Sequence, residues 1–389
     1  MSRRTYAPSA SKDLDRKTRN AVGDFSTAMR GSRLKLDPDT LREFSATYAN
    51  VPTLVLHTML LDMEPSHVAH LMIGLGDYKY RGIRASDRIS ALISRPHHSE
   101  HCIRQDGAGV CDYHPWQTFA YGALAGVHPD KIIASSRLSF RDLALNSRVV
   151  ELPPSEYHDL GHLLVGAALL TPDRKLGFTL SGRRLTLEQI VEIALNVHKT
   201  DDERPRLCFD FHLTEGLTLA TASIPGLQHM REQVKELLDL QLQTLTVIGA
   251  LLAKVVSNVN KMRRPARTHE EQACFGVFCN QCNSIPSWIG HALELAAVAE
   301  IHGFELTQEQ KNTITFVANT ASELSLMELL QDDFAVLAHW RRALTLILEI
   351  DKANELGRPL STVDFSAYSV DFDRRQQMGI RLGDIIIRF

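Results

Sequence analysis

The spacing of apolar residues constrains the fold of this chain more than any other feature of its sequence. In one typical segment, apolar side chains recur at steps of three and four residues, at Leu187, Ile190, Val191, Ala194 and Leu195. In an α-helix this spacing collects them on one face. Regular alternation of polar and apolar residues, which marks a half-buried strand, is scarce along the chain. The sequence therefore predicts an all-α protein.

Proline and glycine indicate where these helices end. The segment from Gln228 to Met262 contains no proline and a single glycine, Gly249, so one long helix, or a helix with one break, can fill it. Similar patterns predict further helices over residues 39–49, 65–74, 116–127, 285–301, 307–330 and 334–353. We expect about a dozen helices joined by short turns.

About a dozen helices without strands between them can form a multi-helix bundle, a solenoid or an α/α toroid of paired helices. The chain has no sequence repeat of fixed period, which argues against a solenoid. Polar and aromatic residues recur near the predicted helix starts, as they would if successive helices opened onto one central cavity: His114, Trp116, His158, His212, His339 and Trp340. This recurrence favours the toroid.

The two ends of the chain differ from its helical middle. Residues 1–35 are expected to form a mobile arm, and residues 36–362 a single helical domain that carries the functional site. Residues 363–389 form a C-terminal tail whose last stretch, IRLGDIIIRF, has the pattern of a short strand. Because an unpaired apolar strand seeks a sheet edge, we expect this tail to support a homo-oligomer.

The composition argues against several classes of protein. With 389 residues, 44% of them hydrophobic and 23% charged, the chain has the make-up of a globular protein. Its net charge of −3 gives no strong field for nucleic acid. No stretch approaches the roughly 18 uninterrupted apolar residues of a membrane span. Six cysteines, without an apolar secretion signal near the N-terminus, are expected to be reduced, so we expect a cytoplasmic protein.

The stretch EYHDLGHLLVG, residues 156–166, is the strongest candidate for chemistry. A helix that starts at the first residue of this stretch would place His158 and His162 one turn apart, with both imidazoles able to reach a single ion. The later segment CFDFHLTEGLTLATA sets His212 and Glu215 three residues apart on one face. Two helices could thus supply four metal ligands: His158, His162, His212 and Glu215.

The five residues HDLGH, 158–162, resemble two known metal-binding patterns. They are similar to the histidine–glutamate–x–x–histidine helix of zinc peptidases, with Asp159 in the place of the glutamate that activates water. They also resemble the adjacent histidine and aspartate of HD-type phosphohydrolases, both of which bind metal. The second resemblance implies further ligands upstream and downstream: His101 or His114, and Asp201 or Asp210. Both resemblances imply a metal-dependent hydrolase.

A polar loop is expected over residues 96–115, which hold four histidines and two cysteines but no steady period. Its charged and imidazole groups could not all be buried without partners, so we expect a lid over the cavity. From this loop we take His101, Tyr113 and His114 as candidates for acid–base catalysis. The same groups could serve a metal-free lyase or epimerase, and the helical layout resembles that of sugar lyases and epimerases built on α/α toroids.

Two further clusters have structural interpretations. The segment CFGVFCNQC spaces Cys274, Cys279 and Cys282 like one class of iron–sulfur ligands, but its apolar neighbours favour buried free thiols. Arg341 and Arg342 could bind an anion. On an amphipathic helix that packs by its apolar face, however, they are expected to face water.

Together these features favour a metal-dependent enzyme, with hydrolysis as the leading reaction. His158, His162 and Glu215 would hold the ion with His212 as a possible fourth ligand, while Asp159 or His114 would handle the proton. The ion would be zinc or iron, with manganese as a third candidate, and the substrate a small molecule or a peptide. Three alternatives stay open: a non-haem iron oxygenase on the same ligands, the metal-free lyase or epimerase, and a helical scaffold that only binds a partner.

Overall fold

The computed structural model describes residues 65–80, 82–93, 103–104, 111–112, 114–133, 137–200, 208–262, 284–322, 334–363 and 369. Within these ranges 68% of the residues are helical, in 11 α-helices, so the prediction of a mostly helical fold is confirmed. None of these helices is long and apolar enough to cross a membrane. The expected N-terminal arm, nearly all of the C-terminal tail and the clustered cysteines Cys274, Cys279 and Cys282 lie outside the described residues.

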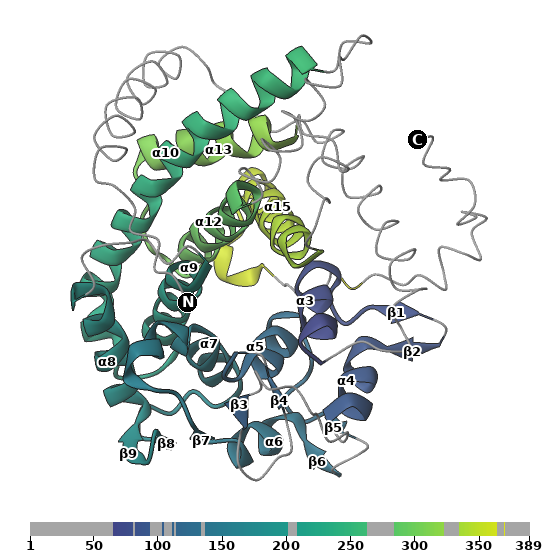
Figure 1. Cartoon of the computed structure of the whole chain (residues 1–389), viewed down its shortest axis with the longest axis vertical. Coiled ribbons are helices and arrows are strands. Elements are labelled where there is room, and N and C mark those ends of the chain that lie inside the picture. The colour runs from purple at the N-terminus through teal and green to yellow at the C-terminus, as the bar shows by residue number, and fades with distance from the viewer. Residues whose placement is uncertain are drawn as a thin grey trace, which may run out of the picture.

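Six α-helices form a closed circuit of contacts around the middle of the molecule (Figure 1). Each packs against the next of the six along the chain, and the last packs against the first. In order they are α3 (Pro65–Leu75), α5 (Gln117–Leu124), α7 (Gly161–Leu170), α9 (Cys208–Ser223), α12 (Ser284–Ile301) and α15 (Phe334–Glu355). Their buried apolar side chains belong to one continuous core.

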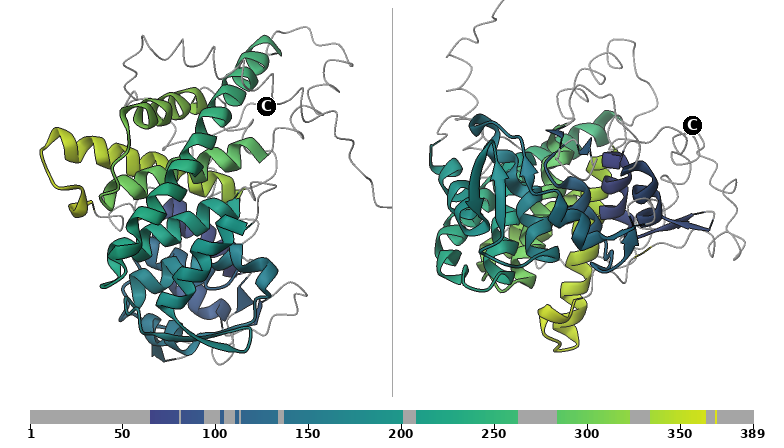
Figure 2. Two further views of the ribbon diagram at one scale, coloured as in Figure 1. Left: turned by 90° about the vertical axis from the view of Figure 1, so that its left-hand side faces the viewer. Right: turned by 90° about the horizontal axis from the view of Figure 1, so that it is seen from below.

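Five more helices lie outside this circuit: α4 (Ala85–Ile93), α6 (Phe140–Asn146), α8 (Leu187–Thr200), α10 (Arg231–Met262) and α13 (Gln308–Ser322). The long helix α10 fills most of the proline-free segment and packs against α9, α12 and α13. Three 3₁₀ helices complete the helical part: η1 (Pro154–Leu160), η2 (Gln228–Met230) and η3 (Leu360–Thr362). Figure 2 shows the C-terminal end of α15 and η3 projecting beyond the other helices.

Nine short strands occur in the described residues, and the all-α prediction did not include them. Antiparallel hairpins pair β1 (Lys79–Tyr80) with β2 (Ile83–Arg84), β3 (Ile103–Arg104) with β4 (Cys111–Asp112), and β5 (Ile132–Ile133) with β6 (Leu138–Ser139). A three-stranded sheet sets β8 (Gly177–Leu180) between parallel β7 (Val149–Val150) and antiparallel β9 (Arg183–Thr186). Most of these strands have only two residues, too few to show alternation. The prediction of an irregular loop over residues 96–115 is therefore wrong in part, because β3 and β4 lie within that range.

Glycine lets α7 and α9 approach until their backbones touch. A Cβ atom on Gly161 would lie 2.4 Å from the carbonyl carbon of His212 and 2.6 Å from the amide nitrogen of Leu213. A Cβ atom on Gly216 would in turn lie 2.6 Å from the carbonyl oxygen of Gly161. No larger residue fits at either position without moving backbone. This contact brings the ring of His162 to 4.4 Å from the ring of His212, centroid to centroid.

The helices α12 and α15 also meet at a glycine. A Cβ atom on Gly290 would lie 2.5 Å from Cδ1 of the fully buried Trp340, so the indole occupies the space that a side chain would need. Beside this contact the rings of His291 and His339 stack with their centroids 3.8 Å apart. Close helix packing thus places histidines of neighbouring helices against one another.

Replacing Gly161 with alanine should destabilise the protein, because the added methyl group would meet backbone atoms of α9 that have no room to move. We expect the free energy of unfolding to fall by about 3 kcal/mol, the upper part of the usual range for overpacking. Gly177→Ala is the matched control, since a Cβ atom there meets nothing within 4 Å. Urea unfolding of both variants measures the difference, and equal midpoints would contradict the contact between α7 and α9.

Candidate metal centre

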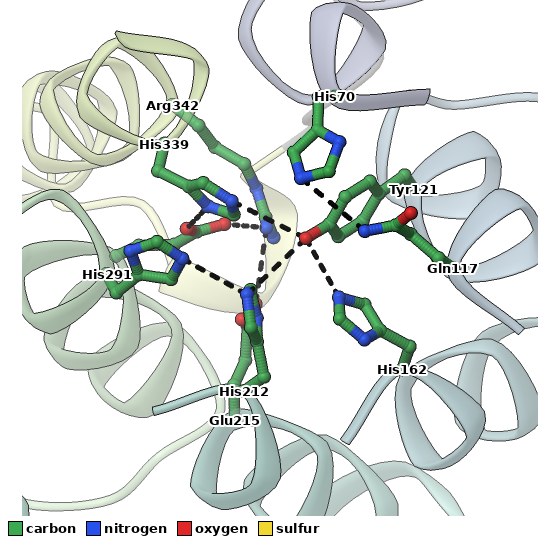
Figure 3. Close-up of polar contacts among 10 residues, drawn as sticks. His70, Gln117, Tyr121, His162, His212, Glu215, His291, His339 and Arg342 are labelled. Carbon is green, nitrogen blue, oxygen red and sulfur yellow. Dashed lines mark hydrogen bonds and ion pairs between the residues drawn. The ribbon is translucent and has the colours of Figure 1, made fainter. Parts of the chain in front are cut away.

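Polar side chains from three neighbouring helices of the circuit meet in the middle of the molecule (Figure 3). Each helix carries a histidine followed three residues later by a charged residue, so both side chains leave from the same face. The pairs are His212 and Glu215 on α9, His291 and Glu294 on α12, and His339 and Arg342 on α15. All six side chains are buried. A repeated register of histidine and charge therefore builds this centre.

The hydroxyl group of Tyr121, from α5, lies among the histidine rings (Figure 3). Its oxygen is 2.8 Å from Nε2 of His162 and 3.4 Å from Nε2 of both His212 and His339. A phenol has one proton to donate. Tyr121 can therefore donate to one of these nitrogens at a time, while its oxygen faces the others.

Three of the histidines offer nitrogens close enough to bind one ion. One ring nitrogen each from His212, His291 and His339 lies within 4.8 Å of the other two. The Nε2 atoms of His212 and His291 are 3.1 Å apart. At that distance two neutral imidazoles either share a proton in a hydrogen bond or coordinate the same ion. Among the residues that the structure describes, this is the group with metal-ligand spacing, and we call it the three-histidine group.

Burial keeps three imidazoles of the centre neutral, those of His162, His212 and His339. It lowers the pKa of His339 to about 3, and the nearby charge of Arg342 acts in the same direction. Burial, together with the surrounding histidines, also holds the pKa values of His162 and His212 well below their ordinary value. Neutral imidazole is the form that binds metal ions. His212 and His339 thus present uncharged nitrogen ligands at neutral pH.

Arg342 connects the two glutamates of the centre. Its Nη1 donates a hydrogen bond to Oε1 of Glu215 at 3.2 Å and another to Oε1 of Glu294. The other oxygen of Glu294 is 2.6 Å from Nδ1 of His339 and accepts its hydrogen bond. Burial raises the pKa values of both carboxyl groups, that of Glu215 to about 8, and the charge of Arg342 opposes this rise. Arg342 therefore engages both carboxyl groups.

A second polar group borders the centre beside α7. Nδ1 of His114 is 3.0 Å from Oδ2 of Asp159, and the His114 ring stacks on the ring of His162 with the centroids 5.3 Å apart. The other oxygen of Asp159 lies 4.0 Å from Nδ1 of His162. That buried nitrogen has no hydrogen-bond partner among the described residues. Burial raises the pKa of Asp159, while the hydrogen bond with His114 lowers it.

The structure brings together most of the described residues that the sequence marked as candidates: His114, Asp159, His162, His212 and Glu215. Of these, His212 belongs to the three-histidine group, and Glu215 faces Arg342. His158 is half-buried and lies outside that group. His101 and Tyr113 lie outside the described residues, so their predicted roles in catalysis stay predictions.

The local fold explains why His158 and His162 do not pair as expected. Residues 154–160 form the 3₁₀ helix η1, and the α-helix begins only at Gly161. In a 3₁₀ helix residues three apart lie above one another. Asp159, three residues before His162, therefore approaches it, and the shared face predicted for His158 and His162 required an α-helix that begins earlier.

Several residues of the centre were not identified from the sequence: His70, Tyr121, His291, Glu294 and Arg342. The prediction that Arg342 faces water is wrong, because its side chain is buried against two carboxylates. His70, on α3, lies at the edge of the centre, and its Nε2 is 3.4 Å from Nε2 of Gln117. The spacing histidine–x–x–charge, which recurs in α9, α12 and α15, is the sequence signal that could have found most of them.

The metal-free protein should be most stable near pH 6.5. The lowered pKa values of His162, His212 and His339 contribute stability that is present above pH 6.5 and lost as the pH falls toward the folded values. The raised pKa of Glu215 contributes stability that is present below pH 4.5 and lost as the pH rises through about 8. Between pH 6.5 and about 8 the carboxyl groups of Glu215 and Glu294 have the larger effect, so the free energy of unfolding falls as the pH rises.

Glu215→Gln should remove much of this loss, because glutamine keeps the size of the side chain and does not titrate. We expect wild-type protein to lose about 1–2 kcal/mol of unfolding free energy between pH 6.5 and 8, and the variant less than half of that. Urea unfolding at the two pH values, with a chelator present, is the measurement. A wild-type stability that keeps rising up to pH 8 would contradict the raised pKa of Glu215.

Comparisons of this chain with models of protein families, with curated proteins and with solved structures find no match.

Proposed function

We propose that this chain is a metal-dependent enzyme whose ion is held by the three-histidine group, His212, His291 and His339. The observation that carries the proposal is the convergence of three buried imidazoles from three separate helices, with one ring nitrogen of each within 4.8 Å of the others. One ring nitrogen of each can reach a single ion, and neutral imidazole is the commonest metal ligand among protein side chains.

The contact between Glu294 and His339 supports this ligand set. The carboxylate accepts a hydrogen bond from Nδ1, so the lone pair of the neutral ring lies on Nε2, which faces Tyr121 and the other histidines. A carboxylate that fixes the tautomer of a histidine in this way is a common support of metal ligands. Glu294 would thus orient His339 toward the ion without binding the ion itself.

The ligand chemistry selects among metals. Imidazole nitrogens suit zinc, iron and copper, whereas manganese and magnesium favour carboxylate and water oxygens. Arg342 already engages the carboxylates of Glu215 and Glu294. We therefore propose iron or zinc for this centre and rank manganese below both.

Of the two metal-dependent reactions that the sequence left open, oxidation has more support than hydrolysis. In zinc peptidases a carboxylate beside the ion activates water, and Asp159 is the residue that the sequence suggests for this role. Asp159 instead contacts His114 through Oδ2, and its Oδ1 lies 4.0 Å from Nδ1 of His162. We propose oxygen chemistry at a non-haem iron ion, which needs open coordination positions but no carboxylate to activate water. Such sites commonly use two histidines and a carboxylate as ligands, and here a third histidine would take the place of the carboxylate.

Hydrolysis is the second candidate, and the short contact between Tyr121 and His162 favours it. At 2.8 Å, His162 could take a proton from water through the Tyr121 hydroxyl group, as a general base does. A metal-free lyase or epimerase could use the same pair of side chains.

We further propose that the closed circuit of six helices is a toroid-like ring. The cytoplasmic location, the small-molecule substrate and the homo-oligomer stay predictions.

Metal content distinguishes the three-histidine group from the ligands expected from the sequence. We expect wild-type protein, purified without an affinity tag, to hold about one zinc or iron ion per chain. His291→Ala and His339→Ala should each lower this content at least fivefold, because two imidazoles bind much more weakly than three. His158→Ala is the matched control and should keep its metal. Elemental analysis showing loss in His158→Ala and none in His291→Ala would contradict the proposal.

The reaction class can be tested without a substrate. Protein loaded with iron(II) in the absence of air should bind nitric oxide, an analogue of dioxygen, if the ion has an open coordination position. We expect the electron paramagnetic resonance signal of an iron–nitrosyl complex, and no such signal from His291→Ala. Iron that is bound stoichiometrically but does not bind nitric oxide would contradict the oxidative role and leave hydrolysis as the leading reaction.

A further inference from the structure

The hydroxyl oxygen of Tyr121 lies as far from two of the three histidines as two ligands of one ion lie from each other. Ligands held about 2.0–2.1 Å from a tetrahedral ion lie about 3.3 Å from one another. The oxygen of Tyr121 is 3.4 Å from Nε2 of His212 and 3.4 Å from Nε2 of His339, and the Nε2 atoms of His212 and His291 are 3.1 Å apart. These three separations match the edges of one coordination shell.

From this geometry we propose that Tyr121 is a fourth ligand of the ion, bound through its oxygen as a phenolate. The inference depends on the metal centre proposed above and adds an anionic ligand to it. Figure 3 shows the Tyr121 oxygen between the histidine rings, with His291 and His339 on one side of it and His162 on the other. A phenol placed there only for packing would not need to direct its hydroxyl group at several imidazoles.

A nitrogen beside the Tyr121 hydroxyl group can take its proton when the phenolate forms. When the bond between oxygen and metal forms, the O–H bond of Tyr121 breaks and the proton is released to solvent, as metal binding to a protonated ligand requires. The first acceptor on its way out is Nε2 of His162, 2.8 Å from the Tyr121 oxygen. Asp159 lies on the other side of that ring, with Oδ1 at 4.0 Å from Nδ1 of His162. No electron is transferred in this step.

Charge gives a second reason for an oxygen ligand. A divalent or trivalent ion bound only by neutral imidazoles would keep its whole charge in a buried site, which is costly. The carboxylates of Glu215 and Glu294 lie close to the centre, but Arg342 engages both. Among the groups that approach the three-histidine group, Tyr121 can supply the negative charge without breaking that cluster.

This ligand would set the chemistry of the ion. A phenolate oxygen is a hard, anionic donor, so it stabilises the oxidised states iron(III) and copper(II) over the reduced ones. Such complexes absorb visible light because charge moves from the phenolate to the metal. Zinc(II) gives no such absorption, since its d shell is full. A coloured protein would therefore identify the ligand directly.

Copper(II) is the probe of choice, because it needs no oxidant to reach the required state. Metal-free wild-type protein is loaded with one equivalent of copper(II), and the visible spectrum is recorded beside those of Tyr121→Phe and Tyr157→Phe. Tyr157 is the matched control: it is buried, and its hydroxyl group has no hydrogen-bond partner among the described residues. We expect a charge-transfer band in wild-type and Tyr157→Phe protein, and at least tenfold less absorption in Tyr121→Phe.

Resonance Raman spectra of the wild-type complex, excited within the band, should show vibrations of a metal-bound phenolate even if Tyr121→Phe fails to fold. Copper that binds stoichiometrically without the band, or a band that survives in folded Tyr121→Phe, would overturn the role of Tyr121 and leave the three-histidine group standing. Wild-type protein that binds neither copper nor iron would overturn the role of Tyr121, and wild-type protein that binds no zinc either would overturn the metal centre as well.

Discussion

The buried charge cluster around Arg342 is the interaction on which the centre of this protein depends. Arg342 reaches from α15 to Glu215 on α9 and Glu294 on α12, so it connects the three helices that carry the three-histidine group. Removing one partner of a buried ion pair leaves an uncompensated charge, which typically costs about 3–5 kcal/mol. Each histidine precedes a member of this cluster by three residues, so the cluster fixes the register in which the imidazoles face one another.

The cluster also determines which groups remain available for chemistry. Arg342 engages both carboxylates, and burial keeps His212 and His339 uncharged. What faces the middle of the centre is a set of imidazole nitrogens and the hydroxyl oxygen of Tyr121. A site of this composition suits a transition-metal ion better than an organic cation or a nucleotide phosphate. The proposed function follows from that selection of ligands.

The sequence predicts the helices well and the centre only in part, for physical reasons. Apolar periodicity and the absence of proline predict helices such as α8 and α10, because both are local properties of the sequence. Strands of two residues carry no periodicity, and the 3₁₀ turn after Pro153 shifted the face that His158 was expected to share. The spacing of His212 and Glu215 predicts one face of the centre correctly. The same spacing at His291 and His339 does not by itself predict a site, because the sequence does not tell which helix faces meet.

The most direct test of the central claim is a crystal structure with diffraction data collected at the absorption edge of the bound metal. The account predicts an anomalous peak about 2.0–2.2 Å from one nitrogen of each of His212, His291 and His339. A peak between His158, His162 and Glu215 would instead support the ligands expected from the sequence. Crystals grown with iron and zinc that show these three histidines only hydrogen-bonded to one another, with no anomalous peak, would contradict the account.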